Sequence, residues 1–445
     1  MKILQSRARG FEQDLDAILA QRKRQMAGVE EQVRGIIEGV RQKGDQALIQ
    51  YSREFDGVAI SLEEMEVPKE AWVRARKGMA KDDLRSLERA AEQIGSFHRR
   101  QLRPSWFDSA QGIVRGQMLR PLARAGVYVP GGKAAYPSSL LMNVIPAKVA
   151  GVSEVVVMTP PSKQGVSPAV LAAAEIAQAD RVFTAGGAQA IAALAYGTRT
   201  VPQVDIIVGP GNAYVTAAKR LLFGVVMVDL VAGPSEILVL ADGSTPARLA
   251  AADLLSQAEH DEQAWPVLVT PSQLFVQEVE QEIGKLLKSL SRQEIITACL
   301  EQQGLIIIVR DLAEGVKLAN RIAPEHLELA LEDPWGWLGQ VENAGAVFLG
   351  SYTPEAVGDY MGGPNHVLPT AGTARFFSPL GVENFVKRTN ILSFSRQALE
   401  GVQEDVARLA RLEGLEAHAR AVEVRGKCHD VTSPQSDQKR KGRGC

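Results

Sequence analysis

The sequence is poor in cysteine and has no long apolar run. Its 445 residues include Cys299, Cys428 and Cys445, which are too few for a disulfide framework and lack the C-x-x-C spacing of a thiolate zinc site. No uncharged apolar run approaches the roughly 18 residues that span a bilayer. The first residues, MKILQSRARG, turn polar too early for a signal peptide. We therefore expect a cytoplasmic protein with no membrane partner.

Neither sign of charge is in excess. The chain has 50 Lys and Arg residues against 52 Asp and Glu residues, a net charge of −2. Binding of nucleic acid through bulk charge requires a basic excess, so no nucleic-acid partner is expected. Hydrophobic residues make up 45% of the chain and charged residues 23%, which is typical of a folded globular protein and excludes wholesale disorder.

The hydrophobic pattern changes along the chain. Residues 11–101 mix charged and apolar residues at helical spacing. From about 126 to 349, short β-branched runs such as GVYVP, SEVVVM and WPVLVTP alternate with segments of helical length, which indicates parallel sheets covered by helices on both faces. Residues 350–381 are rich in glycine and proline, as expected for a long functional loop. Residues 403–425 return to a helical pattern.

These patterns predict an α/β protein with two Rossmann-like parallel-sheet domains, a helical N-terminal segment and a small helical C-terminal segment. The similar strand endings VVVMTPPS and PVLVTPS hint that the two α/β domains are duplicated halves. The expected boundaries are 1–26 for the N-terminal helical segment, 27–125 plus 237–381 for a discontinuous first α/β domain, 126–236 for the second, 382–426 for the C-terminal helical domain and 427–445 for a disordered tail.

Only six histidines occur, so each candidate metal ligand or general base can be considered individually. Gln257 and His260 are three residues apart on a predicted helix, so one helix face could offer two ligands to a metal ion. An exposed polar helix face explains the same spacing. Glu325 and His326 stand in a loop before the strand LELAL, at the mouth of a sheet, where α/β enzymes place their sites. Such a pair suits proton transfer near neutral pH, although an incidental histidine beside a helix-start glutamate is an alternative.

Two more pairs fall near glycines. Asp359 and His366 belong to GDYMGGPNH, whose glycines permit backbone angles that let both side chains point inward. Glu413 and His418 flank Gly414 at a predicted helix end. Plain surface positions remain an alternative for both pairs. By contrast, Cys299 has no basic neighbour that would lower the pKa of its thiol, so it is expected to pack in the core.

Glycine clusters follow three predicted strands and precede helices. They are Gly131-Gly132, Gly186-Gly187 and Gly209-Pro210-Gly211. This placement aims backbone N–H groups of a helix N-terminus at a bound phosphate. None of the clusters matches G-x-G-x-x-G, so the dinucleotide fingerprint is absent. The residues alone indicate an anion-binding α/β domain, or glycines that only serve tight turns.

Taken together, the motifs are specific. They occur in the order GVYVPGGKAAYPSS, GGAQAIAALAYGT, VDIIVGPGNAYV, AGPSEILVLAD, DLLSQAEHD, APEHLEL, GDYMGGPNHVLPT and EGLEAHA. With them the chain closely resembles the histidinol dehydrogenase family from about residue 11 to 425. The resemblance implies an NAD-dependent, zinc-containing enzyme that oxidises L-histidinol through L-histidinal to L-histidine, the last two steps of histidine biosynthesis.

The resemblance also implies a role for individual residues. Matching the family's motifs gives Gln257, His260, Asp359 and His418 as ligands of one Zn²⁺ per subunit, which holds the substrate. The further substrate contacts implied are Ser235, His326, His366 and Glu413. The NAD⁺ contacts implied are Tyr128, Gln189 and Asn212, all in the second α/β domain.

The implied assembly is a homodimer with shared active sites. Residues 382–426 are too few to support a core of their own, so they must pack on another surface. In the family that surface belongs to the partner subunit. The C-terminal domain is therefore expected to bring Glu413 and His418 to the partner's site.

The implied chemistry needs two bases. His326 is expected to act as general base toward the substrate in both oxidations, and Glu325 to activate the water that adds to the aldehyde. Two other hypotheses remain open on the sequence alone. A zinc hydrolase would use Glu325 to activate water on an amide or ester without NAD⁺, and a non-catalytic metal-binding relative would turn over nothing.

Overall fold

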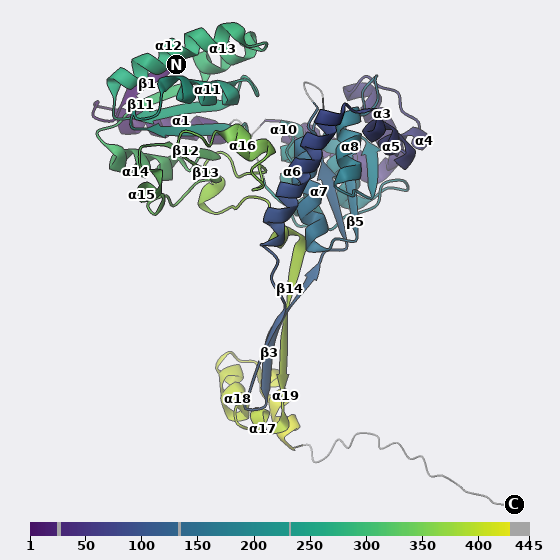
Figure 1. Cartoon of the computed structure of the whole chain (residues 1–445). Coiled ribbons are helices and arrows are strands. Elements are labelled where there is room, and N and C mark those ends of the chain that lie inside the picture. Colours follow the sequence, from purple (N-terminus) through teal and green to yellow (C-terminus); the bar gives the residue numbers. More distant parts are fainter. Residues whose placement is uncertain (25–27, 132–134, 231–232, 428–445) are drawn as a thin grey trace, which may run out of the picture. The chain divides into compact units, whose positions relative to one another are not determined.

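The structure is a computed structural model that describes residues 1–24, 28–131, 135–230 and 233–427 (Figure 1). The chain divides into two compact units, each described by itself. The first unit comprises Met1–Leu102 and Pro121–Val386, and the second comprises Arg103–Arg120 and the chain from Lys387 onward. Within the described ranges, no helix is both long and apolar enough to cross a membrane. The expected disordered tail, 427–445, lies outside the described residues except for Lys427, which belongs to the last described helix.

The first unit contains a parallel sheet, sheet A, for which six strands are described. Their order is β1-β11-β10-β9-β12-β13. The strands are β1 (Lys2–Gln5), β9 (Glu236–Ala241), β10 (Trp265–Thr270), β11 (Leu305–Ile308), β12 (His326–Ala330) and β13 (Ala346–Leu349). The helices that connect or follow them are α1 (Phe11–Arg24), α11 (Ala247–Ala258), α12 (Gln273–Leu286), α13 (Gln293–Gln302), α14 (Leu312–Ile322), α15 (Pro334–Leu338) and α16 (Glu355–Tyr360).

Alternate residues of sheet A face opposite helix layers. In β9, Ile237 and Val239 pack with α11, α12 and α13, and this layer also buries Cys299. Leu238 and Leu240 of the same strand pack with α1 and α14 on the other face. This period-two alternation, with apolar residues on both faces, explains why the strands read as continuous apolar runs.

A second parallel sheet, sheet B, lies in the same unit, with five strands in the described residues. Their order is β6-β5-β4-β7-β8. The strands are β4 (Arg124–Tyr128), β5 (Glu154–Thr159), β6 (Arg181–Thr184), β7 (Ile206–Val208) and β8 (Met227–Val228). The helices α7 (Pro137–Ala150), α8 (Pro168–Ile176), α9 (Gly187–Tyr196) and α10 (Ala213–Leu221) connect or follow these strands. Numbered from β4, this is the order 3-2-1-4-5 of a Rossmann-type sheet.

Helices from the N-terminal part of the chain cover sheet B. They are α2 (Glu30–Lys43), α3 (Asp45–Phe55), α4 (Leu62–Met65), α5 (Lys69–Gly78) and α6 (Lys81–Arg99). Trp72 of α5 and Ile94 of α6 join α7 and α8 on one face. Residues of α2, α3 and α4 join α9 and α10 on the other. Figure 1 shows α6 and α7 running side by side, as their contacts require.

The α/β fold with two parallel sheets is confirmed, but the structure draws the boundaries differently. Residues 1–26 are not a separate helical segment, because β1 pairs with β11 and α1 packs on sheet A. The helices between residues 30 and 99 pack on sheet B instead of joining 237–381. Helical spacing shows which face of a helix is apolar but not which sheet that face will cover, so the sequence could not assign these helices.

The second unit contains strands as well as helices. A three-stranded sheet has the order β14-β3-β2, built from β2 (Trp106–Ala110), β3 (Ile113–Pro121) and β14 (Val386–Phe394). Its helices are α17 (Arg396–Glu400), α18 (Gln403–Leu412) and α19 (Glu416–Lys427), with a small core of Ala407, Ala410 and Ala419. The expected C-terminal helical segment therefore also recruits a hairpin from residues 106–121.

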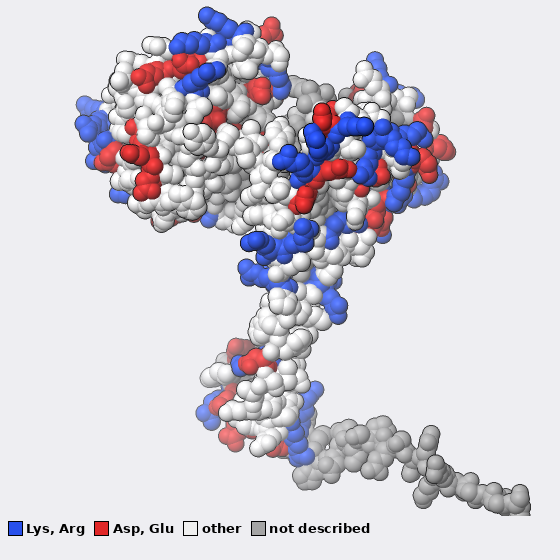
Figure 2. Space-filling model, in the orientation of Figure 1, with Lys and Arg blue, Asp and Glu red and all other residues white. Residues whose placement is uncertain are grey.

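Acidic and basic side chains are interspersed over most of the face of the molecule shown in Figure 2. This mixture reflects the near balance of 50 basic and 52 acidic residues.

Candidate functional site

Glu325 and His326 lie at the beginning of β12. The helix before them, α14, ends at Ala323, which adopts a left-handed conformation with φ of +52° and turns the chain toward sheet A. Both side chains are buried, with 6% of Glu325 and 4% of His326 exposed. The pair therefore stands at the amino end of a parallel strand, whereas ligands of open α/β sheets usually bind at the carboxyl ends.

The main chain of Glu236, the first residue of the neighbouring strand β9, orients both side chains. Its N–H donates a 2.8 Å hydrogen bond to Oε2 of Glu325, and its carbonyl oxygen lies 2.8 Å from Nδ1 of His326. Because a carbonyl only accepts, Nδ1 carries a proton, and in the neutral imidazole Nε2 is the atom with the free lone pair. Nε2 is buried and has no hydrogen-bond partner among the described residues. Burial raises the pKa of Glu325 to about 8.

The side chain of Glu236 is tied to α1. Its Oε1 accepts hydrogen bonds from Nε and Nη2 of Arg22 at 3.1 and 2.9 Å, and a third from the N–H of Ala371 at 3.1 Å. The Arg22 guanidinium also lies 4.3 Å from the centre of the Trp265 ring. Arg22 and Glu236 thus form a buried ion pair that holds the start of β9, and no sequence motif pointed to it.

A group of side chains that could hold a metal ion, which we call the metal-ligating group, lies beside His326. One ligand atom from each of His260, Glu355 and Asp359 falls within 4.8 Å of the others. His260 follows the end of α11, one turn beyond Gln257, instead of standing on the helix itself. Gln257 is completely buried, and both polar atoms of its amide lack a partner among the described residues. An amide oxygen left in this state fits a metal ion as its missing partner.

Glu355 is the residue of this group that the motif analysis missed. It begins α16, four residues before Asp359, so the two side chains share one helix face. This spacing of four residues is visible in the sequence. Oε1 of Glu355 lies 3.6 Å from Nδ1 of His326. Burial first, and then the neighbouring carboxylates Asp359 and Asp253, raise the pKa of Glu355 well above its usual range.

His366 and Ser235 reach the same region from two further loops. Nδ1 of His366 donates to the carbonyl oxygen of Asp359 at 3.1 Å. Burial lowers the pKa of His366, which favours its neutral form. Ser235 directly precedes Glu236, and its carbonyl oxygen accepts from the N–H of Trp265. Both residues therefore lie in loops near Glu325 and His326.

A pocket of about 550 Å³ opens at the metal-ligating group. His260 and Asp359 line it together with Tyr136, Arg292 and Tyr360. Glu413 and His418 are not among the residues that the first unit brings together. Both are exposed in the second unit, where Glu413 ends α18 and His418 lies in the first turns of α19.

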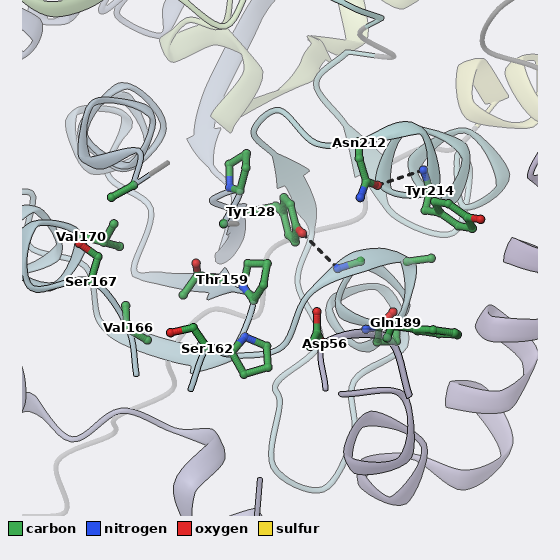
Figure 3. A pocket seen from close by; sticks show the side chains of 18 of the residues that line it. Asp56, Tyr128, Thr159, Ser162, Val166, Ser167, Val170, Gln189, Asn212 and Tyr214 are labelled. Carbon is green, nitrogen blue, oxygen red and sulfur yellow. Dashed lines mark hydrogen bonds between the residues drawn. The ribbon is translucent and has the colours of Figure 1, made fainter. Parts of the chain in front are cut away.

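A larger pocket of about 1000 Å³ lies at the carboxyl ends of the strands of sheet B. Tyr128, Gln189 and Asn212, the three residues expected to contact NAD⁺, all line it, as does Gly187 at the start of α9. Figure 3 shows Tyr128, Gln189 and Asn212 around one cavity. Gly131 also lines the pocket, and its motif partner Gly132 lies outside the described residues.

Local hydrogen bonds hold the walls of this pocket. The N–H of Gly187 donates to the Tyr128 hydroxyl at 3.1 Å, and burial raises the pKa of that hydroxyl to about 12. The Asn212 side chain caps α10 by accepting from the N–H groups of Tyr214 and Val215, both at 3.1 Å. Helix N-termini of this kind suit the phosphates of a nucleotide.

Asp56 is a wall residue that no sequence motif indicated. It follows α3 and lines the same pocket. Its Oδ2 is buried without a hydrogen-bond partner in the part of the chain that the structure describes. Burial raises the pKa of its carboxyl group to about 6.

Comparisons of the sequence and of the structure with known proteins point to the same family. A family model described as histidinol dehydrogenase matches residues 19–426. The histidinol dehydrogenase of Syntrophotalea carbinolica is 50% identical, over 96% of this chain and 99% of the relative, and that of Nitrosomonas europaea is 51% identical, over 93% and 96%. A crystal structure of histidinol dehydrogenase from Elizabethkingia anophelis superposes with a TM-score of 0.89 at 32% identity, covering 96% of this chain and 98% of that one.

Proposed function

The chain belongs to the histidinol dehydrogenase family of histidine biosynthesis, and we propose that it oxidises L-histidinol through L-histidinal to L-histidine with two NAD⁺. The observation that best supports this proposal is the buried pair at the start of β12. There Nδ1 of His326 is held by the Glu236 carbonyl and lies 3.8 Å from Oε2 of Glu325 and 3.6 Å from Oε1 of Glu355, while Nε2 has no hydrogen-bond partner among the described residues.

We propose that the metal-binding residues are Gln257, His260, Asp359 and, from a second subunit, His418. The unpartnered amide of Gln257 and the proximity of His260 to Asp359 support this set. When bound, a zinc ion would hold the imidazole and amine nitrogens of the substrate and so retain the reactive aldehyde. Ser235, His366 and Glu413 complete the proposed substrate contacts.

In the first oxidation, His326 is the general base. Its Nε2 takes the hydroxyl proton of histidinol as the hydride leaves the same carbon for NAD⁺. The Nδ1–H bond to the Glu236 carbonyl holds the tautomer in which Nε2 is the basic atom. This bond also stabilises the imidazolium that forms, because its proton stays directed at a carbonyl oxygen.

In the second oxidation, the aldehyde must first take up water, since it has no hydroxyl proton to release. Glu325 is the proposed base for that water, and a carboxylate with a raised pKa is a stronger base once ionised. His326 then takes a proton from the hydrate as the second hydride leaves. Cys299 cannot supply a thioester route, because it is buried in the core and burial raises the pKa of its thiol to about 12.

The proposed cofactor site is the larger pocket, where Tyr128, Gln189 and Asn212 would contact NAD⁺. Its position at the carboxyl ends of a 3-2-1-4-5 sheet supports this assignment even though G-x-G-x-x-G is absent. Because Glu413 and His418 belong to the second unit, we propose that a homodimer completes each active site.

The test is the stoichiometry of the reaction. Purified protein with limiting L-histidinol should form two NADH per molecule consumed, and a carbonyl reagent in the solution should trap no free histidinal. One NADH with trapped aldehyde would contradict the two-step proposal. Ester or amide hydrolysis in the absence of NAD⁺ would instead support the zinc hydrolase.

A further inference from the structure

The larger pocket has two distinguishable ends. Ala135 lines both this pocket and the smaller pocket at His260 and Asp359, and Ala169 of α8 lines the smaller one beside Pro168 and Val170 of the larger. The reactive ring of a dinucleotide must reach the catalytic pair, so the nicotinamide belongs at this end. The opposite end, with Asp56, Gln189 and Tyr214, is left for the adenosine. Figure 3 shows Ser167 and Val170 on one side of the cavity and these three residues on the other.

Sheet B has no acidic residue directly after its second strand, where dinucleotide-binding folds usually place the one that binds the ribose. In Rossmann-type domains an Asp or Glu that follows the second strand binds the ribose hydroxyls of NAD⁺. Here the second strand of the order is β5, and Pro160, Pro161 and Ser162 follow it. The sheet itself therefore supplies no carboxylate at this point.

Asp56 brings a carboxylate to the pocket from outside the sheet. It caps the C-terminus of α3, a helix that packs against α9. One of its oxygens is shielded from solvent and lacks a hydrogen-bond donor among the described residues. Leaving a buried carboxylate oxygen without a donor is costly, so a ligand hydroxyl would relieve an existing deficit.

The charges around the pocket select against an additional phosphate. Of the described residues that line it, Glu54 and Asp56 are the charged ones, and neither Lys nor Arg is among them. NADP⁺ differs from NAD⁺ by a 2′-phosphate on the adenosine ribose, and sites that accept this group usually place an arginine beside it.

We propose that Asp56 binds the adenosine ribose of NAD⁺ through its 2′-hydroxyl and excludes NADP⁺ by repelling the 2′-phosphate. This inference rests on the proposed function, because it requires that NAD⁺ occupies the larger pocket. In this proposal, a residue outside the Rossmann-type sheet binds the ribose hydroxyl that the acidic residue after the second strand usually binds.

The test compares two cofactors in Asp56→Asn, which removes the charge at nearly constant size. With histidinol as substrate, KM for NAD⁺ should rise about tenfold, the loss expected when a hydrogen bond to a charged group is weakened. The ratio of kcat/KM for NADP⁺ to that for NAD⁺ should rise at least about tenfold over wild type. Glu31→Gln, which neutralises an exposed carboxylate of α2 outside the pocket, should leave both values unchanged.

A cofactor analogue tests the same contact without relying on the variant. The analogue is NAD⁺ without the 2′-hydroxyl of its adenosine ribose. Wild type should use it with a kcat/KM about tenfold lower than for NAD⁺, and Asp56→Asn should discriminate less between the two cofactors. Equal use of both by wild type, or an unchanged NADP⁺ to NAD⁺ ratio in Asp56→Asn, would overturn the assignment to Asp56. Failure of wild type to reduce NAD⁺ with histidinol would instead overturn the proposed function.

Discussion

Glu236 orients Glu325 and His326, the proposed catalytic pair, through its main chain. Its N–H holds Glu325, and its carbonyl oxygen fixes the protonated nitrogen of His326. Its carboxylate is held in turn by Arg22 from α1. Removing Arg22 or the Glu236 carboxylate would leave the other charge of this buried ion pair uncompensated. The position of the first residues of β9 therefore depends on the ion pair.

Mutation of Glu325 should separate its proposed role from that of His326. Glu325→Gln should lower the rate of the second oxidation by about 10²–10⁴-fold, the typical loss for a positioned general base. The first oxidation should keep a substantial fraction of its rate, because the His326 tautomer depends on the Glu236 carbonyl and not on Glu325. Supplying histidinol or histidinal separately and following NADH measures each step.

The pH dependence gives this prediction a second readout. A base acts in its ionised form, so the wild-type rate from histidinal should increase as the pH rises through about 8, the raised pKa of Glu325. This dependence should disappear in Glu325→Gln. Glu332→Gln, at an exposed carboxylate near the other end of β12, should behave as wild type. Equal losses in both oxidations would assign Glu325 another role.

At the residue scale, the sequence reveals neighbours in the chain better than neighbours in space. Glu325 and His326 are adjacent, so the pair was visible as a motif. The ion pair between Arg22 and Glu236 joins positions 214 residues apart, and sequence spacing cannot show such a contact. Glu355 is intermediate, because its spacing of four from Asp359 could have been recognised on a predicted helix.

At the scale of elements, the two sheets use opposite ends. The larger pocket follows the rule for open α/β sheets and lies at the carboxyl ends of β4 and β5. Glu325 and Ser235 directly precede β12 and β9, and His326 begins β12, so these proposed site residues lie at the amino ends of sheet A. Strand patterns locate both ends equally well, so the sequence predicted the strands and the loops but could not decide which end of sheet A holds the site.

The turn between β7 and α10 should be sensitive to one added methyl group. Gly209 has φ of +107°, and a Cβ there would overlap the carbonyl oxygen of Tyr128. Gly209→Ala should reduce the free energy of unfolding by about 1–3 kcal/mol from backbone strain alone. It should also raise KM for NAD⁺, because the overlap displaces Tyr128 or the turn that leads to Asn212.

A matched glycine separates these two effects. Gly224 has a similar φ of +93° but nothing within 4 Å of an added Cβ. Gly224→Ala should therefore show only the strain in urea unfolding, with KM for NAD⁺ unchanged. If both variants raised KM equally, the Tyr128 contact would not be the reason for glycine at position 209.

At the scale of the whole molecule, the sequence predicted the fold class but not which segments pack together. Two parallel sheets with helices on both faces followed from β-branched runs and helical spacing. The pairing of β1 with β11, and the packing of residues 30–99 on sheet B, are contacts between distant parts of the chain. Several sheet faces offer similar apolar partners to such helices, so periodicity alone does not choose among them.

The second unit carries two of the proposed site residues and has a small core of its own. Its helices α18 and α19 bury Ala407, Ala410 and Ala419, while Leu409, Leu412 and Leu415 are exposed in the single chain. Exposed apolar residues of this kind are typical of an interaction surface. In the proposed homodimer, a second copy of the chain would bring His418 to the proposed metal site of Gln257, His260 and Asp359.

Subunit exchange tests this shared site. His418→Asn and Glu325→Gln proteins should each be inactive in the overall conversion of histidinol to histidine. In a mixed dimer, the core that retains Glu325 meets the intact His418 of the other chain, so one site is wild type and the other carries both defects. Random exchange of equal amounts makes about half of the dimers mixed, so activity should recover to roughly a quarter of wild type for a two-fold dimer. If His418 instead served its own chain, no pairing could rebuild a site, and proven exchange would restore no activity.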